Sequence, residues 1–190
     1  MDFSSPHPKP RIGTAEEIAT TLVYKLRDFN QTVGVAESFT GGGIMATITS
    51  VPGSSAVLHG GVVSYATSVK REVLGVEDSL IAKEGVIHPE VARQMAKGAR
   101  KITSHGSITT WGIATTGVAG PASQDNKPAG TVYIGIDSSK ESWTWGPFNF
   151  PGDRDEVRQA TIKEALCLLH DILEDGKAGE VPHTTGHSEN

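Results

Sequence analysis

A serine followed by hydroxyl and glycine residues is the densest chemical signal in the sequence. Ser38 lies in the run ESFTGGG at positions 37–43, between a predicted strand and a predicted helix. Free amides at the start of such a helix can bind an anion, either a phosphate or the oxyanion of an acyl-transfer intermediate. We therefore expect Ser38 to be a nucleophile, and Thr40, Gly41 and Gly42 to contact the substrate.

The same glycines have a plainer interpretation, which stays open on the residues alone. Glycine adopts backbone conformations that other residues avoid, so the run would also serve simply to make a tight turn. Its spacing matches neither the phosphate-binding P-loop nor the glycine fingerprint of dinucleotide-binding folds.

A serine nucleophile needs a base, and lysine is the best candidate. The seven histidines show no spacing that yields a Ser-His-Asp arrangement. Lys70 follows a predicted strand that could pair beside the one ending at Ser38, which would bring both residues to one sheet edge. A lysine desolvated in a cleft has a lowered pKa and can accept a serine proton. Alternatively, Lys70 is a solvated surface charge.

Tyr65 and Arg154 could complete such a site. Tyr65 could orient the lysine or donate a hydrogen bond to the substrate, although a core or interface aromatic is an equally good interpretation. Arg154 opens a late predicted helix, where it could bind a phosphate or a carboxylate. A salt bridge between Arg154 and a nearby acidic side chain is the alternative.

A second glycine-containing segment is predicted to frame the same pocket. The run TGVAGP at 116–121 follows a β-rich stretch. Its glycines and proline are expected to end the strand at Thr115 and to form a tight loop. We therefore predict that Thr116, Gly117 and Gly120 contact the substrate.

Several classes of function are disfavoured. His59, His88 and His105 have neither paired spacing nor neighbouring cysteines, so no metal site is predicted. The single cysteine, Cys167, excludes a disulfide within the chain and favours a cytoplasmic setting. A net charge of −5 argues against nucleic acid or anionic lipid as a partner. No run approaches the ~20 apolar residues that span a bilayer.

Strands and helices are predicted to alternate, which is typical of the α/β class. The spacing of Thr14 and Glu17 is typical of a capping box at a helix start, and Asp153 could cap a long late helix. This order predicts a single-domain, three-layer α/β/α sandwich around a mixed sheet, over residues 13–175. A flexible arm is expected at 1–12 and a disordered tail at 176–190. The predicted strands are 32–36, 60–65, 108–115, 131–136 and 142–150.

Six short motifs, taken together, point to a known family. They are AESFTGG at 36–42, GSS at 53–55, GVVSY at 61–65 with Lys70, TGVAGP at 116–121, KPAGTV at 127–132 and GDR at 152–154. In this order they resemble the C-terminal domain of the competence/damage-inducible CinA proteins, over about residues 14–174. One such tripeptide means little, whereas six in the right order are specific.

The resemblance implies a nicotinamide-nucleotide amidase. Such an enzyme converts nicotinamide mononucleotide and water to nicotinic acid mononucleotide and ammonia in pyridine-nucleotide salvage. The resemblance also implies an α/β/α fold, a homo-oligomer and no cofactor. It assigns catalysis to Ser38 with Lys70, and it places Tyr65 and the two glycine loops around the pocket.

Three departures from the family pattern bear on substrate and nucleophile. Phe39 replaces the usual cysteine, which leaves Ser38 as the better nucleophile. His88 stands where serine is common, and ASQD at 122–125 replaces a more glycine-rich stretch. Two other functions therefore stay open: a catalytically silent nucleotide-binding module, and an amidohydrolase acting on a related carboxamide.

Overall fold

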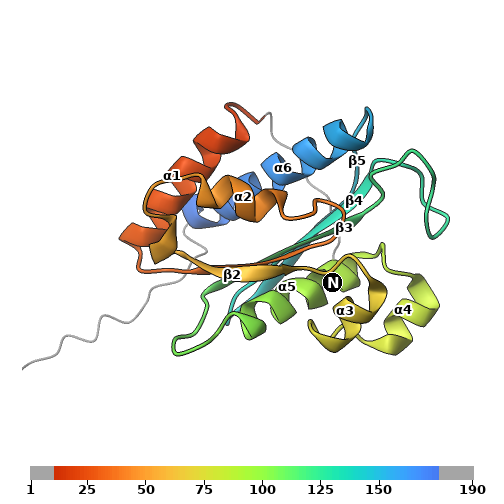
Figure 1. Ribbon diagram of the computed structural model, residues 1–190, viewed down its shortest axis with the longest axis horizontal. Helices are drawn as coiled ribbons and strands as arrows, with labels where there is room; N and C mark the ends of the chain where they lie inside the picture. Colours follow the sequence, from red (N-terminus) through yellow and green to blue (C-terminus); the bar gives the residue numbers. More distant parts are fainter. Residues whose placement is uncertain (1–10, 176–190) are drawn as a thin grey trace, which may run out of the picture.

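A computed structural model describes residues 11–175, which form a five-stranded mixed sheet covered by helices on both faces (Figure 1). The strand order is β2-β1-β3-β4-β5. β1 pairs in parallel with β2 and β3, whereas β4 runs antiparallel to both of its neighbours, β3 and β5. The strands are β1 (Val33–Glu37), β2 (Leu58–Val63), β3 (Trp111–Gly117), β4 (Thr131–Asp137) and β5 (Ser142–Asn149).

The helices form a layer on each side of the sheet. In Figure 1, α1 (Ala15–Asp28), α2 (Gly43–Thr49) and α6 (Arg154–Glu174) lie above the sheet. On the opposite side are α3 (Thr67–Glu72), α4 (Asp78–Glu84) and α5 (Pro89–Ile102). The predicted three-layer α/β/α architecture is confirmed.

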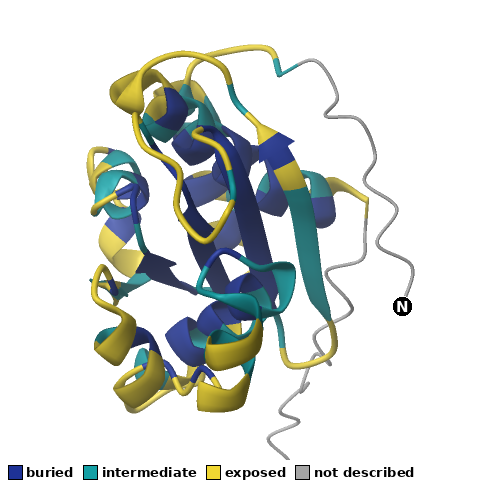
Figure 2. Ribbon diagram, turned by 90° about the vertical axis from the view of Figure 1, so that its right-hand side faces the viewer, coloured by how far each residue is buried: buried dark blue, intermediate teal, exposed yellow. Residues whose placement is uncertain are grey.

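The central strands are buried on both sides. Every residue of β1, β3 and β4 is buried, and these strands appear dark blue between the helical layers in Figure 2. A strand that packs against helices on both faces is expected to be apolar throughout rather than alternating. β2 and β5 lie at the two edges and are only partly buried.

α5 packs directly on the sheet backbone where three strands carry a glycine in place of a side chain. Gly34, Gly112 and Gly135 belong to β1, β3 and β4. A Cβ atom added to any of them would come within 2.0–2.9 Å of a carbonyl oxygen of α5. We call this contact the glycine seam. The three carbonyls belong to residues about one helical turn apart, namely Ala92, Ala96 and Ala99.

The predicted helix caps are confirmed. The side chain of Thr14 accepts the amide of Glu17, whose carboxylate accepts the amide of Thr14 in return. Asp153 caps α6 by accepting the amides of Asp155 and Glu156. These bonds satisfy donors that a helix start otherwise leaves unpaired.

Two predicted strands have the wrong bounds: β2 covers Leu58–Val63 rather than 60–65, and β3 covers Trp111–Gly117 rather than 108–115. β3 continues through Thr116 and Gly117, which pair with Tyr133 and Val132 of β4, and the loop starts at Val118. Gly117 lies so close to β4 that an added Cβ would be 2.6 Å from the carbonyl oxygen of Thr131. Glycine therefore permits this strand pairing rather than ending it.

Arg11 ties the start of the described chain to α6. Its guanidinium lies 2.7 Å from a carboxylate oxygen of Glu164 and 2.6 Å from one of Asp171. Most of the predicted arm and the whole of the predicted tail lie outside the described residues. Within the described part, none of the helices combines the length and the apolar character needed to cross a bilayer.

Candidate active site

Ser38 and Lys70 meet at the carboxyl ends of two neighbouring parallel strands. Ser38 directly follows β1, and Lys70 lies on α3, which follows β2. Because β1 and β2 are parallel neighbours, both chains leave the sheet at the same edge. The Nζ atom of Lys70 donates a hydrogen bond of 3.1 Å to Oγ of Ser38.

Lys70 is buried, so the alternative of a solvated surface charge is wrong. The residue is 1% exposed, and Nζ also donates to the carbonyl oxygens of Ser64, at 2.5 Å, and Tyr65, at 3.4 Å. Burial lowers the pKa of Lys70 from 10.5 to about 8, because the charged form loses its hydration. At pH 7, about one molecule in ten therefore carries a neutral amine at Lys70.

The amides at the start of α2 are not free, contrary to the sequence-based expectation. The carboxylate of Glu37 accepts the N–H groups of Gly42, Ile44 and Met45 at 3.0–3.1 Å. Glu37 is fully buried. The protein thus places its own carboxylate where a phosphate or an oxyanion was expected.

Three residues that were predicted to contact substrate do not line the cavity around Ser38. The hydroxyl of Thr40 pairs with that of Thr115 in the interior, and the amide of Gly41 donates to the carbonyl oxygen of Ser38. The amide of Gly42 is occupied by Glu37. Gly41 and Gly42 have φ values of 66° and 96°, so their tight turn accounts for these two glycines.

Two other amides of the loop lack an acceptor in the described part of the chain, and of their two residues only Phe39 lines the cavity. Among the described residues, neither the N–H of Phe39 nor that of Thr40 has a hydrogen-bond acceptor. Phe39 directly follows Ser38, and in serine hydrolases the N–H of the residue after the nucleophile is a common oxyanion donor. The glycine run had suggested amides further along the loop, but Glu37 accepts the hydrogen bonds of those at Gly42, Ile44 and Met45.

A cavity of about 370 Å³ opens above Ser38 and Lys70. Its wall consists of the β2–α3 connection, the end of β3, the loop that follows it and the start of α6. Apart from Tyr65, its lining contains only two ionisable side chains, Lys70 and Arg154, and both are basic. The lining residues are Ser38, Phe39, Tyr65, Thr67, Lys70, Val86, the run 116–124 and Arg154.

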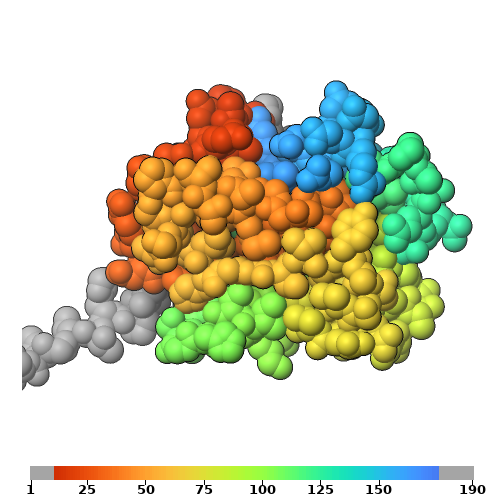
Figure 3. Space-filling model, viewed as in Figure 1, coloured from red at the N-terminus to blue at the C-terminus, as the bar shows by residue number. Residues whose placement is uncertain are grey.

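Arg154 joins the three segments around the mouth of this cavity. Its guanidinium donates to the carbonyl oxygen of Gly120 and to the hydroxyl of Tyr65, both at 2.9 Å. Figure 3 shows the yellow β2–α3 region, the green loop and the blue start of α6 meeting at one side of the molecule. Arg154 forms no salt bridge within residues 11–175, and Tyr65 is 62% exposed. The salt-bridge and core-aromatic alternatives are therefore wrong.

The second glycine segment lines the cavity as predicted. Thr116, Gly117 and Gly120 all belong to its wall. The hydroxyl of Thr116 donates to the carbonyl oxygen of Val86 at 2.7 Å, which fixes it against the α4–α5 connection.

The departures from the family pattern differ in their consequences. His88 caps α5 by accepting the amide of Glu90, a task that serine also performs, and it does not line the cavity. In the ASQD run, Ala122, Ser123 and Gln124 line the cavity. The carboxylate of the run's last residue, Asp125, accepts the amide of Val86 at 2.7 Å and holds the loop in place.

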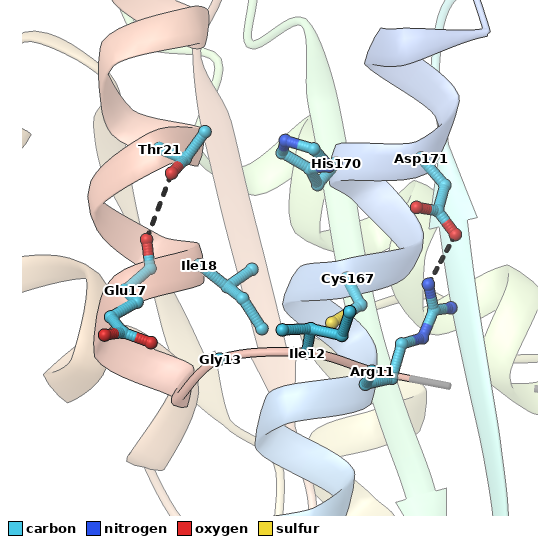
Figure 4. A pocket seen from close by; sticks show the side chains of 9 residues that line it. All are labelled: Arg11, Ile12, Gly13, Glu17, Ile18, Thr21, Cys167, His170 and Asp171. Atoms are coloured by element: carbon cyan, nitrogen blue, oxygen red, sulfur yellow. Dashed lines mark hydrogen bonds and ion pairs between the residues drawn. The ribbon is translucent and has the colours of Figure 1, made fainter. Parts of the chain in front are cut away.

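A larger cavity, of about 500 Å³, lies between α1 and α6 but lacks comparable chemistry (Figure 4). Burial raises the pKa of the Cys167 thiol to about 11, so this sulfur is protonated at neutral pH. Arg11 is engaged by Asp171, as the dashed line in Figure 4 marks. Nor do the described residues contain a group of three or more His, Cys, Asp or Glu side chains suited to a metal ion.

Comparisons with known proteins show which family this chain is similar to. Residues 15–173 match the family model of the CinA C-terminal domain. A CinA-like protein from Frankia casuarinae is 43% identical over 161 residues, which cover 85% of this chain. A CinA-like protein from Synechococcus sp. is 38% identical over 156 residues, which cover 81%. The chain spans only 36% of the length of either of these curated relatives.

Solved structures of similar proteins share the fold over nearly their whole length. The competence/damage inducible protein CihA from Agrobacterium tumefaciens superposes with a TM-score of 0.78 at 31% identity, over 88% of this chain and 99% of that one. A CinA superfamily protein from Klebsiella pneumoniae gives a TM-score of 0.80 at 26% identity, over 86% and 99%.

Proposed function

Because the chain belongs to the CinA C-terminal domain family, we propose that it hydrolyses the carboxamide of nicotinamide mononucleotide, releasing nicotinic acid mononucleotide and ammonia. Ser38 is the nucleophile and Lys70 the base. The observation that carries this proposal is the 3.1 Å hydrogen bond between Nζ of Lys70 and Oγ of Ser38 at the base of a cavity. A buried lysine paired with a serine is one of the known variants of the catalytic triad.

The proposed reaction uses Lys70 twice. Its neutral amine accepts the proton of Ser38, and the serine oxygen attacks the carboxamide carbon. When the C–N bond breaks, Lys70 returns that proton to the nitrogen, and ammonia leaves. Water then hydrolyses the nicotinoyl ester of Ser38 with the same base. In both steps the N–H of Phe39 is the proposed donor to the oxyanion.

The charge of the cavity supports a phosphorylated substrate. Lys70 and Arg154 are its only charged side chains, and neither has a carboxylate within the lining. A guanidinium at the mouth can donate two hydrogen bonds to a phosphate. Arg154 would exchange its contacts with Gly120 and Tyr65 for the substrate.

The test is ammonia release from nicotinamide mononucleotide by the purified chain. Ser38→Ala and Lys70→Ala are each expected to lower kcat by ~10²-fold or more. Lys83→Ala is the matched control, because the Lys83 side chain is 81% exposed and lies outside the cavity. Full activity of Ser38→Ala would rule out the proposed nucleophile. Binding of the mononucleotide without ammonia release by the wild type would instead indicate a silent nucleotide-binding module.

A related carboxamide is the second candidate substrate, and the loop after Gly120 favours testing it. Ala122, Ser123 and Gln124 depart from the family pattern and line the cavity directly. Turnover of nicotinamide, its riboside and its mononucleotide should therefore be compared. Faster hydrolysis of an unphosphorylated compound would favour this candidate and argue against a phosphate contact at Arg154.

A further inference from the structure

We propose that Glu37 is a positioning residue. It fixes the position of the nucleophile, Ser38, relative to the base, Lys70, without touching the substrate. The inference rests on the proposed roles of Ser38 and Lys70. It is drawn from two sets of contacts made by Glu37, one through its carboxylate and one through its carbonyl oxygen.

The carboxylate fixes the nucleophile loop. One carboxylate oxygen of Glu37 accepts the amides of Gly42 and Ile44, and the other accepts the amide of Met45. These bonds connect the last residue of β1 to the first turn of α2. Ser38 lies between the two anchored ends, so the three bonds limit how far its loop can move.

The carbonyl oxygen of Glu37 fixes the base. It accepts the amide of Ser64 at 2.7 Å and the hydroxyl of Ser64 at 3.3 Å. The carbonyl oxygen of Ser64 in turn accepts Nζ of Lys70 at 2.5 Å. The base is thus connected, through a single residue, to the residue that directly precedes the nucleophile.

The chemistry of Glu37 favours more than a helix cap. Burying a carboxylate completely has a large desolvation cost. An exposed serine or aspartate can cap a helix without that cost. Here the carboxylate satisfies three amides at once, which a single neutral acceptor cannot do with comparable strength. Three such bonds next to Ser38 restrict the movement of its loop. They thereby help to keep the distance between Oγ of Ser38 and Nζ of Lys70 constant.

Glu37→Gln tests this role, because glutamine keeps the length of the side chain but has only one acceptor oxygen. At least one of the three amides then faces an NH₂ group, and the loop shifts. We expect kcat for ammonia release to fall at least ~10-fold with KM within about twofold, since a positioning defect affects the reacting atoms rather than substrate binding. Thr14→Ala is the matched control: it removes a helix cap that is remote from the cavity, and should leave kcat unchanged.

A second measurement separates this inference from the choice of substrate. A fluorophosphonate probe forms a bond between Oγ of Ser38 and phosphorus, with loss of fluoride and transfer of the serine proton to Lys70. The rate of labelling is measured by mass spectrometry of the intact protein. We expect Glu37→Gln to slow labelling at least ~10-fold and Thr14→Ala to label at the wild-type rate.

Each outcome supports or overturns a defined claim. Wild-type kcat and labelling rate in Glu37→Gln would overturn the positioning role. If that variant does not fold, Glu37→Asp replaces it, because its carboxylate is one methylene too short to reach all three amides; wild-type rates in a folded Glu37→Asp would be equally decisive against the role. A wild type that is labelled but releases no ammonia would overturn only the substrate. A wild type that is not labelled would overturn the nucleophile, and the positioning role with it.

Discussion

Two opposing effects act on the amine of Lys70, and their balance decides whether it can serve as a base. Its three carbonyl and hydroxyl acceptors favour the charged ammonium form, whereas burial disfavours it. Burial prevails, because no carboxylate lies among these acceptors and the pKa falls to about 8. A base with a pKa near the working pH combines a useful neutral fraction with adequate basicity.

This balance predicts a specific pH dependence. Only the neutral amine of Lys70 can accept the serine proton, so kcat/KM should rise about tenfold per pH unit up to a midpoint near pH 8 and then level off. With an ordinary lysine pKa the rise would continue past pH 10. The measurement is kcat/KM between pH 6 and 10, with melting curves at each pH to show that the fold is intact.

Lys70→Arg is the matching control for the pH profile. A guanidinium is not deprotonated in this range, so the variant should be inactive at every pH and show no rising limb. A wild-type profile that is flat from pH 6 to 10 would contradict the role of Lys70 as the base.

At the scale of elements, the glycine seam determines how the lower helical layer sits on the sheet. Since β1, β3 and β4 each contribute a glycine under α5, the helix backbone contacts the sheet directly. The same helix begins at the α4–α5 connection, where Val86 is hydrogen-bonded to Thr116 in the cavity wall and to Asp125 next to that wall. The depth of α5 therefore influences the position of the cavity wall.

Gly112→Ala tests the seam. The added Cβ would lie 2.0 Å from the carbonyl oxygen of Ala96, and backbone atoms on both sides must move. We expect a loss of about 3 kcal/mol in the free energy of unfolding, measured by urea denaturation. Gly106→Ala is the control: no atom lies within 4 Å of its added Cβ, and only its positive φ of 75° opposes the change. If Gly112→Ala lowers the free energy of unfolding by no more than Gly106→Ala does, the glycine seam does not require glycine at position 112.

At the scale of the whole molecule, ion pairs connect the two ends of the described chain. Arg11 reaches Glu164 and Asp171 near the other end of the described chain. The side chain of Glu164 is only 5% exposed, so this ion pair is largely shielded from water.

Arg11→Ala should therefore destabilise the fold while leaving the site intact. The variant leaves the carboxylate of Glu164 buried without its partner, which we expect to cost about 2–4 kcal/mol in urea denaturation. Lys83→Ala removes an exposed ion pair and should change stability by less than ~1 kcal/mol. Because Arg11 is remote from Ser38, kcat of the folded variant should equal that of the wild type. A loss of less than ~1 kcal/mol in the free energy of unfolding of Arg11→Ala would show that its ion pairs with Glu164 and Asp171 are dispensable.

Much of the fold was predictable because its signals are local. Hydrophobic periodicity and caps gave the helices, and the order of elements gave the α/β/α layers. The approach of Lys70 to Ser38 followed from placing two parallel strands side by side. The occupant of the amides at the start of α2 was not predictable, because the hydrogen-bond partners of Glu37 depend on how its side chain packs. Gly117 was predicted to end its strand, because the local sequence does not show how closely it packs against β4.

The glycine seam has a consequence for how this molecule tolerates change over evolution. Gly34, Gly112 and Gly135 carry no chemistry, do not line the cavity around Ser38 and contribute little to any hydropathy profile. Yet each position excludes the smallest possible side-chain addition. If every single substitution were scored by the amount of folded protein, these three sites would be among the least replaceable. The intolerant positions would then mark the contact between α5 and the sheet rather than the cavity around Ser38.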